Sequence, residues 1–260
     1  MKYTKHWLAI LAMAAWLGVS AVAQAQSAQE IVAATDKVRN PDKPFRSTLR
    51  LTEYVGGEER DHDSLILYSK EDGATRQFRN LVQYVEPARD SGKRVLLDGH
   101  SLWFYDPNSK VSVRISAQQR LIGQAAIGDI LTVNLAADYT PSIVATETID
   151  DATHQPRNCW HLELKASNDL ATYNRVEYWV EQASFYPIKV KAYSDSGRLL
   201  KILYYGNFTV QLGHVRPTQA IVIDAVDSSL VTRIDLGNFQ FQQIPETWFQ
   251  RDYLPRLRVD

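Results

Sequence analysis

The sequence predicts a mostly β protein built on one antiparallel sheet. From Phe45 onward, apolar and polar residues alternate with a period of two, which is typical of strands that bury one face. The connections are short and carry turn residues, such as Gly56-Gly57 and Asp98-Gly99, so neighbouring strands should pair as hairpins. About 12 strands and only two helical segments are expected. One strongly curved sheet, partly closed as a barrel with helices across its mouth, accounts best for this pattern.

Residues 1–25 have the features of a cleavable signal peptide. A short basic start precedes an apolar stretch over residues 7–23, and Ala23-Gln24-Ala25 is a small-x-small cleavage site. A membrane anchor is the alternative, but an apolar run of about 17 residues lies at the low end of the length that spans a bilayer. We therefore expect a secreted protein with a single domain over residues 26–260.

The composition argues against several classes of function. The chain has 29 basic and 30 acidic residues, and loss of the leader removes Lys2 and Lys5, which leaves a net charge of −3. So mild a charge argues against nucleic acid as a partner. Cys159 is the one cysteine, which excludes an intramolecular disulfide and a cysteine-based metal cluster. We expect it to be a buried structural thiol, and we expect no cofactor and no metal.

The helix and the strands follow from periodicity and turn signals. A first helix is expected over residues 28–38, because Ile31, Val32 and Thr35 share a helical face and prolines follow. The remaining elements are strands that end at Gly, Asp, Asn or Ser. They are expected over residues 45–55, 65–69, 75–84, 93–97, 102–105, 111–115, 142–149, 159–166, 173–181, 188–194, 199–208, 215–225 and 229–236.

Residues 116–134 break the period of two. Ser116 can cap a helix, and an apolar stripe at helical spacing follows. Gly123 and Gly128 interrupt this stripe, and each weakens a helix by about 1 kcal/mol. We expect one broken helix or two short ones, more mobile than the sheet.

Catalytic signatures are missing from the sequence. It contains no Gly-x-Ser-x-Gly motif, no His-Glu-x-x-His motif and no Gly-rich phosphate loop. Asp61-His62-Asp63 is explained by a solvated hairpin loop, and His161 and Glu163 by one face of a half-exposed strand. An enzyme acting on lipid or glycan would need Asp98, His161 or Glu163, and it carries the lowest weight among the hypotheses.

Residues 96–107, with the sequence LLDGHSLWFYDP, resemble a hairpin of the periplasmic lipoprotein carriers, the LolA-like family of outer-membrane lipoprotein-sorting proteins. That family carries a hydrophobic-x-Asp-Gly-x-x-Leu-Trp-x-Tyr-x-Pro pattern. Together with the Arg-Ile-Ser-x-x-x-Arg-Leu-x-Gly run over residues 114–123, the sequence is similar to a branch associated with exporters of the resistance-nodulation-division (RND) type. The likeness extends over essentially the whole mature chain and is strongest over residues 87–139.

The resemblance implies a half-open β-barrel with a helical lid over its concave face. It also implies a non-enzymatic periplasmic carrier that receives a lipid, or the acyl chains of a lipoprotein, from an inner-membrane exporter and passes it to an outer-membrane acceptor. A monomer suffices for this role. The family closes the mouth of its cavity with an arginine before a proline. The nearest residue here is Lys70, which no proline follows.

The candidate site is an apolar cavity. Such a cavity suits an acyl chain, because each methylene that is buried contributes about 0.8 kcal/mol to the free energy of binding. A register slip of one residue exchanges the two faces of a strand, so alternation alone leaves both faces as candidates. The cavity is expected to be lined by Leu49, Leu51, Leu65, Leu67, Val95, Leu97, Trp103, Tyr105, Val113 and Trp160. The lid is expected to consist of Leu121, Ile122, Ile127, Ile130 and Leu131.

A second hypothesis is a periplasmic adaptor that carries no lipid. In that case the sheet has an ordinary filled core, and the protein docks to an RND-type transporter. The aromatic tail over residues 248–254 would form part of its binding surface. The tail is otherwise expected to cover a sheet edge or the open end of the barrel.

Overall fold

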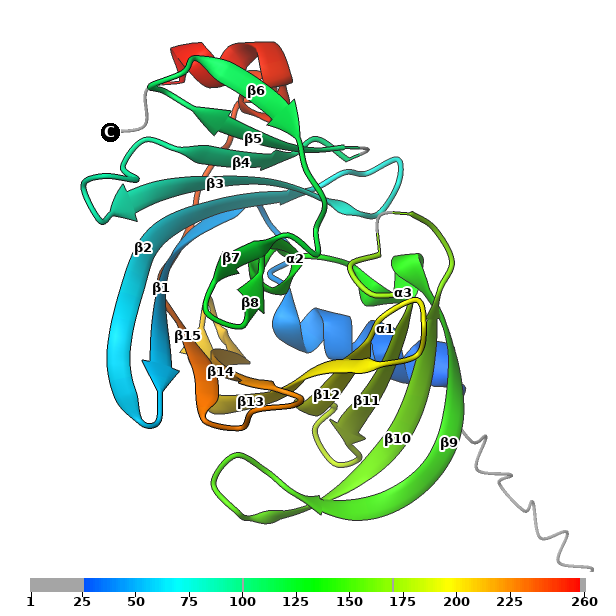
Figure 1. Cartoon of the computed structure of the whole chain (residues 1–260). Helices are drawn as coiled ribbons and strands as arrows, with labels where there is room; N and C mark the ends of the chain where they lie inside the picture. Colours follow the sequence, from blue (N-terminus) through cyan, green and yellow to red (C-terminus); the bar gives the residue numbers. More distant parts are fainter. Residues whose placement is uncertain (1–25, 100, 170, 258–260) are drawn as a thin grey trace, which may run out of the picture.

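The computed structural model describes residues 26–99, 101–169 and 171–257 (Figure 1). The expected signal peptide at residues 1–25 lies outside the described residues. The described chain forms a 13-stranded antiparallel sheet in the order β6-β5-β4-β3-β2-β1-β15-β14-β13-β12-β11-β10-β9. The predicted mostly β fold with one curved, half-open antiparallel sheet is confirmed.

The large sheet is assembled from hairpins, and the first and last strands join its two halves. Strand β1 pairs with β2 on one side and with β15 on the other. The strands are β1 (Phe45–Val55), β2 (Glu58–Glu71), β3 (Phe78–Glu86), β4 (Arg94–Leu97), β5 (Leu102–Asp106), β6 (Val111–Arg114), β9 (Tyr139–Asp150), β10 (Pro156–Ala166), β11 (Arg175–Glu181), β12 (Pro187–Tyr193), β13 (Leu199–Gln211), β14 (His214–Asp224) and β15 (Leu230–Phe241).

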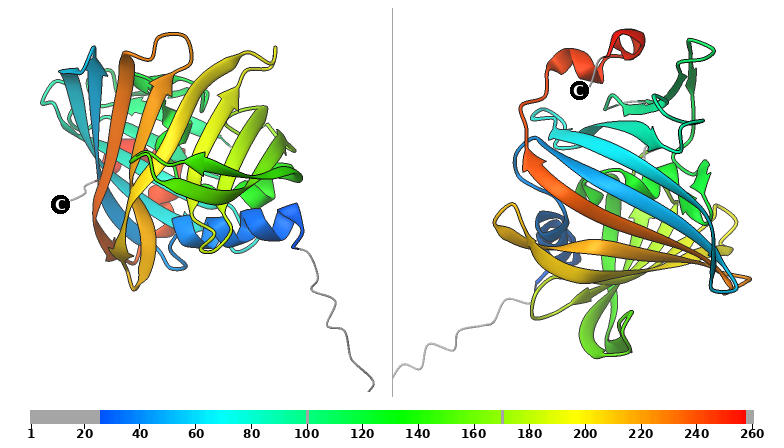
Figure 2. Two further views of the ribbon diagram at one scale, coloured as in Figure 1. Left: turned by 90° about the horizontal axis from the view of Figure 1, so that it is seen from below. Right: turned by 90° about the vertical axis from the view of Figure 1, so that its left-hand side faces the viewer.

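Short elements cover both faces of this sheet. They are α1 (Ala28–Arg39), the two-stranded hairpin of β7 (Arg120–Ile122) and β8 (Ala125–Ala126), the helices α2 (Ile127–Ile130) and α3 (Leu135–Asp138), and the C-terminal 3₁₀ helices η1 (Glu246–Phe249) and η2 (Arg251–Arg256). Figure 2 shows the sheet bent into a half-barrel, with α1 along its concave side and η1 and η2 outside it. Within the described ranges, no helix has the length and apolar character needed to cross a bilayer.

Helix α1 forms where the sequence predicts it and fills one half of the concave face. Ser27 and Glu30 make a capping box, in which each residue's backbone N–H bonds to the other's side chain. Ile31 and Val32 are fully buried against the β10 and β11 side chains of a cluster that includes Leu162. This packing fixes the helix inside the half-barrel.

The prediction of one broken helix or two short helices over residues 116–134 is wrong for most of the segment. Residues 120–126 form the β7–β8 hairpin. Within residues 116–134, only Ile127–Ile130 is helical. Gly123 turns the hairpin with a φ of +52°, a conformation that favours glycine. A Cβ atom at Gly123 would lie 2.2 Å from Oγ1 of Thr232 on β15, so this glycine permits a close approach to the sheet.

Strand β2 begins earlier than the sequence predicts. Asp61-His62-Asp63 lies within β2 and not in a solvated loop, because this polar stretch pairs with the end of β1. Asp63 is only 7% exposed. Burial, together with the nearby carboxylates of Asp90 and Asp61, raises the pKa of Asp63 to about 6.

The C-terminal segment covers the outer face of β2–β5 and not an edge or an open end. Phe249 and Leu254 are buried there against Tyr68, Leu81 and other outward-facing residues. Tyr68 also makes an edge-to-face contact with Trp248, with the ring centroids 5.2 Å apart. The aromatic tail therefore covers the outer face of these strands within the same chain, and Phe249 is buried there.

Replacing Phe249 with Ala should lower the free energy of unfolding by about 3 kcal/mol, because it removes a ring that is 3% exposed. Phe241→Ala is the matched control, since Phe241 is 47% exposed and its loss should change stability by about 0.5 kcal/mol or less. Urea denaturation of both variants measures the difference. A small effect at Phe249 would contradict the covering role of the tail.

Replacing Asp63 with Asn should stabilise the protein by about 2 kcal/mol at about pH 7. The folded-state pKa of Asp63, about 6, lies above its ordinary value of 3.8. Its contribution to stability is therefore present at low pH and is lost as the pH rises through about 6. Unfolding of the wild type and the variant at about pH 5 and pH 7 checks this. The variant should lose part of the pH dependence, and an equal slope in both would contradict the assignment.

Candidate functional site

The concave face of β1–β5 and β13–β15 carries one continuous apolar cluster. Six predicted cavity residues meet in it, and the five predicted lid residues pack against them from the opposite side. The cavity residues in this cluster are Leu49, Leu51, Leu65, Leu67, Val95 and Leu97, and the lid residues are Leu121, Ile122, Ile127, Ile130 and Leu131. The sequence therefore identified most of the side chains that the fold gathers here, although it assigned the lid the wrong secondary structure.

Trp103 and Tyr105 lie on the opposite face of the sheet, and their assignment to the cavity is corrected. In the β4–β5 hairpin, Leu97 pairs with Leu102 and Val95 with Phe104, so Leu102 and Phe104 share the concave face with their partners. Trp103 and Tyr105 point the other way and pack under η1 and η2. The Nε1 atom of Trp103 also donates to Asp98 at 3.0 Å, which ties the hairpin turn.

Two further predicted cavity residues lie apart from the main cluster. Trp160 packs in the second cluster, around α1, and stacks on Phe185 with the ring centroids 5.5 Å apart. Val113 lies opposite Phe104 on the edge strand β6, where it is 47% exposed. Leu102 and Phe104 are residues of the concave cluster that sequence reasoning missed. The hairpin register could have identified them, since Val95 and Leu97 are directly opposite.

The space inside the half-barrel is largely filled by residues 120–131, here called the plug, which comprise β7, β8, α2 and Leu131. Figure 1 shows this segment between the curved sheet and α1. The cavity that remains beside it has a volume of about 80 Å³ and is lined mainly by apolar side chains from β1, β14, β15 and α2. A cavity of about 150 Å³ holds one benzene molecule, so an acyl chain fits here only after the plug has moved.

The plug is held to the sheet by polar contacts as well as by apolar packing. The carboxylate of Asp129 accepts hydrogen bonds from the Lys201 ammonium at 2.9 Å and from the Tyr173 hydroxyl at 2.7 Å. The Gln124 N–H donates to Oγ1 of Thr232 at 2.7 Å. Lys201 and Thr232 lie on β13 and β15 of the sheet, and Tyr173 lies in the loop that leads into β11. The plug therefore leaves the wall only if these bonds are broken or exchanged.

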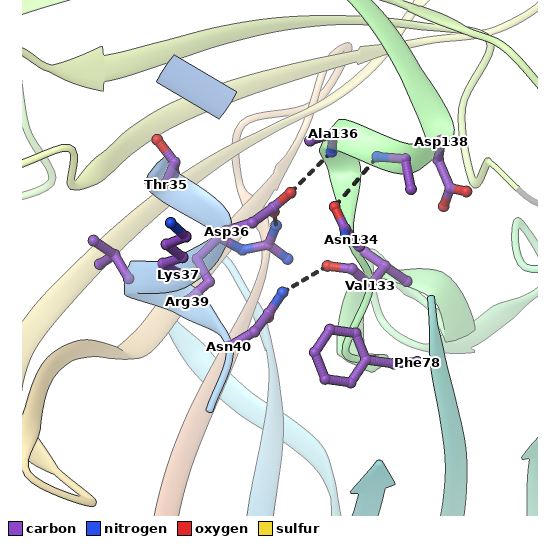
Figure 3. A network of polar contacts seen from close by, with 12 residues as sticks. Thr35, Asp36, Lys37, Arg39, Asn40, Phe78, Val133, Asn134, Ala136 and Asp138 are labelled. Atoms are coloured by element: carbon purple, nitrogen blue, oxygen red, sulfur yellow. Dashed lines mark hydrogen bonds and ion pairs between the residues drawn. The ribbon is translucent and has the colours of Figure 1, made fainter. Parts of the chain in front are cut away.

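The segment that follows the plug is anchored by a second set of hydrogen bonds (Figure 3). The Ala136 N–H donates to Asp36 of α1 at 2.8 Å, and the Asn40 amide donates to the Val133 carbonyl at 2.8 Å. Asp36 also pairs with Arg39 at 3.2 Å. Burial raises the pKa of Asp36 to about 6, although Arg39 and the backbone N–H groups oppose the rise. This network ties the plug's downstream end to α1.

Comparisons with known proteins identify the family. A family model described only as an uncharacterized protein matches residues 76–256. A LolA superfamily protein from Nitrosomonas europaea is 34% identical to the chain, with a TM-score of 0.78, and the match covers 88% of this chain and 100% of that protein. The chain belongs to the LolA-like family. The curated proteins contain no match to it.

Two structures of lower sequence identity share the fold. A DUF1329 family protein from Desulfovibrio piger is 20% identical with a TM-score of 0.74, and the match covers 87% of this chain and 97% of that one. A domain described as an outer membrane lipoprotein-sorting protein, from Vibrio parahaemolyticus, is 19% identical with a TM-score of 0.70. That match covers 88% of this chain and 98% of the domain. The resemblance seen in the sequence is thus confirmed at the level of the family.

Lys70, the nearest match to the family's mouth-closing arginine, does not lie at the mouth of this LolA-like half-barrel. It lies at the end of β2 and pairs with Glu246 of η1. The Glu246 carboxylate also forms an ion pair with the Arg79 guanidinium at 2.9 Å. This pairing holds the C-terminal cover to the outer face. The bonds that close the inner face are those of Asp129 and Lys201.

Of the side chains considered for catalysis, His161 and Glu163 share one face of β10, and Asp98 lies apart from them. His161 lies on β10, stacked on Trp179 at 4.2 Å and 3.2 Å from Glu147, whereas Asp98 lies in the turn of the β4–β5 hairpin. In the part of the chain that the structure describes, no group of three His, Cys, Asp or Glu side chains could hold a metal. Cys159 is buried, as predicted, and burial raises its pKa to about 12.

Replacing Gly128 with Ala should loosen the plug, because the added Cβ atom would lie 2.2 Å from Oγ1 of Thr172. Hydrogen exchange of the plug amides should become about tenfold faster, while the strands stay protected. Gly206→Ala is the matched control, since a Cβ atom there meets nothing within 4 Å. Unchanged exchange in the Gly128 variant would show that the close contact does not hold the plug.

Proposed function

We propose that this protein is a periplasmic carrier that binds a lipid, or the acyl chains of a lipoprotein, on the concave face of its half-barrel. It takes the cargo from inner-membrane export machinery, in our proposal an exporter of the RND type, and delivers it to the outer membrane. The observation that carries this proposal is the apolar concave cluster under a plug that is bonded to the wall by exchangeable polar contacts.

The apolar part of an exchange between the plug and an acyl chain is close to balanced. The plug covers the wall with Ile122, Ile127 and Ile130, which are nearly fully buried. An acyl chain that replaced them would contribute about 0.8 kcal/mol for each buried methylene, or about 8 kcal/mol for ten. Burial of an isoleucine side chain contributes about 1.5–3 kcal/mol, so an acyl chain of this length replaces the apolar packing of the plug, and the polar contacts need a replacement of their own. The cavity of about 80 Å³ beside the plug gives the chain a place to begin its entry.

Further support comes from the sequence and from the relatives. The signal-peptide pattern of residues 1–25 favours export to the periplasm. The relatives named as LolA superfamily and lipoprotein-sorting proteins favour a carrier over an enzyme. The carrier acts as a monomer and uses no cofactor or metal. An adaptor that docks through the aromatic tail receives less support, because Phe249 and Leu254 are buried against the sheet.

Native mass spectrometry of the mature protein from periplasmic extract, with lipid extraction of the same sample, tests the proposal. A stoichiometric lipid or acylated peptide is the expected result, and it identifies the class of cargo. An apo mass, together with no uptake of offered phospholipid or lipopeptide, would contradict the carrier function and leave the concave cluster as an ordinary core.

Replacing Ala220 with Phe should reduce lipid uptake at least about tenfold, because Ala220 lines the cavity and a larger side chain fills it. Ala74→Phe is the matched control, since Ala74 is exposed in the turn between β2 and β3. Uptake is measured by native mass spectrometry after incubation with phospholipid micelles, and circular dichroism checks the fold. Undiminished uptake in a folded Ala220 variant would place the acyl chain elsewhere.

A further inference from the structure

Lys201 is a buried cation on the inner wall of the half-barrel. It lies on β13 two residues before Leu203, which faces the apolar cluster, and it is only 8% exposed. Its ammonium donates to the Asp129 carboxylate at 2.9 Å and to the Gln124 carbonyl at 2.6 Å. Both of these acceptors belong to the plug. The charge of Lys201 is therefore neutralised by the element that has to move.

Displacing the plug separates this ion pair. Asp129 leaves with the plug, whereas Lys201 stays in the wall, and a buried charge without a partner is strongly unfavourable. Asp224 lies opposite Lys201 on β14, but its Oδ1 atom already accepts the N–H groups of Val226 and Asp227. In the open state a new anion therefore competes for Lys201 with Asp224 but not with Asp129, which has left with the plug.

The Arg39–Asp36 pair behaves differently, although it also lies beside the cavity. Both of these residues belong to α1, so movement of the plug leaves their ion pair of 3.2 Å intact. Lys201 is thus the inner-wall cation whose carboxylate partner is carried by the plug.

The surroundings of Lys201 connect an apolar space to a basic groove. On one side of the plug lies the apolar cavity, lined by Ala220 and Leu236 among others. On the other side, an open groove of about 380 Å³ is lined by Lys201, Arg120 and Arg198, with Asp224 as the carboxylate in its lining. Once the plug is displaced, one molecule can place a chain against the apolar wall and a negative group in the basic groove.

We propose that Lys201 is the headgroup site of the carrier, and that its ligand is an anionic lipid whose headgroup replaces the carboxylate of Asp129. This inference rests on the proposed carrier function and names its substrate class. One lipid molecule replaces both kinds of contact that the plug makes. Its acyl chain replaces the apolar plug side chains, and its headgroup replaces the carboxylate of Asp129. A zwitterionic lipid with the same chains lacks the net negative charge and binds more weakly.

Competition between two lipids with identical acyl chains tests the proposal. The full-length mature protein is incubated with mixed micelles of phosphatidylglycerol and phosphatidylcholine, and the bound lipid is identified by native mass spectrometry. The wild type should prefer phosphatidylglycerol at least about tenfold. Lys201→Gln should bring the ratio close to one, whereas the control Lys191→Gln, on the adjacent strand β12 beside Trp179, should keep it.

Asp129→Asn is the second variant, because it keeps Lys201 and removes the competing carboxylate. It should take up phosphatidylglycerol more readily than the wild type does. The double variant Lys201→Met/Asp129→Leu removes both charges together, so that it replaces Lys201→Gln if that protein fails to fold. It should bind both lipids without preference. Glycerol phosphate without acyl chains should show no binding that is lost in Lys201→Gln, since Asp129 holds the ammonium until a chain displaces the plug.

The outcomes separate this inference from the carrier function. If neither lipid binds, the carrier function fails and the headgroup site fails with it. If both lipids bind the wild type equally, or if the preference survives in the folded variants without Lys201, the headgroup site is wrong and the carrier function stands. Binding of free glycerol phosphate that is lost in Lys201→Gln would contradict the proposal that the headgroup reaches Lys201 only when the plug leaves.

Discussion

The inner face of an open, curved sheet has to be covered, and most of this structure follows from how that is done. Thirteen strands bend far enough to present a concave apolar wall, and the open order leaves β6 and β9 at its two ends. Helix α1 covers the β10–β12 part of the wall, and the plug covers the part formed by β1–β5 and β13–β15. The outer face of β2–β5 is covered in turn by η1 and η2. Each of these covers is a segment of the same chain.

The two inner covers differ in how they are held. Helix α1 buries Ile31 and Val32 completely and accepts hydrogen bonds from Arg216 of β14. Its Asp36–Arg39 ion pair lies within the helix. The plug joins apolar packing to a buried ion pair with the wall, whose disruption costs about 3–5 kcal/mol when one charge is left behind. That cost falls sharply if a ligand supplies the missing anion, so an ion pair between cover and wall makes the plug the cover that an anionic ligand can replace.

Much of the fold could be predicted from the sequence because the period of two and the turn residues are local signals. The hairpins and helix α1 follow from them, and so does the alternation that puts Leu49 with Leu51 and Leu65 with Leu67 on one strand face. Which face is the inner one does not follow, because a slip of one residue exchanges the faces. The plug could not, because its apolar spacing fits a helix and its conformation depends on the sheet around it. Gly123 illustrates this, because the absence of a Cβ atom lets the hairpin approach Thr232 closely, and Thr232 lies more than a hundred positions away in the sequence.

Sequence reasoning did not identify Lys201, although the sequence pattern contains a sign of its unusual position. It interrupts the apolar stretch LLKIL at a position that alternation assigns to the same face as Leu203. A cation at an inward position of a strand is unfavourable without a partner, and its partner Asp129 lies 72 residues away. The pattern can therefore mark an inward charge as unusual, but only the fold can say which anion meets it.

The hairpin that reveals the family lies apart from the proposed ligand site. Trp103 and Tyr105 dominate the recognisable motif, yet they face outward, where Trp103 fixes the turn through Asp98 and both rings pack under the C-terminal cover. Their alternate neighbours, Leu102 and Phe104, are the residues that reach the concave wall. A motif that stabilises the sheet in this way identifies the fold but does not determine which cargo binds. In our proposal the inner wall and the plug determine the cargo. Differences in cargo within such a fold should therefore arise at inward positions such as Lys201, whose substitution leaves the hairpin motif unchanged.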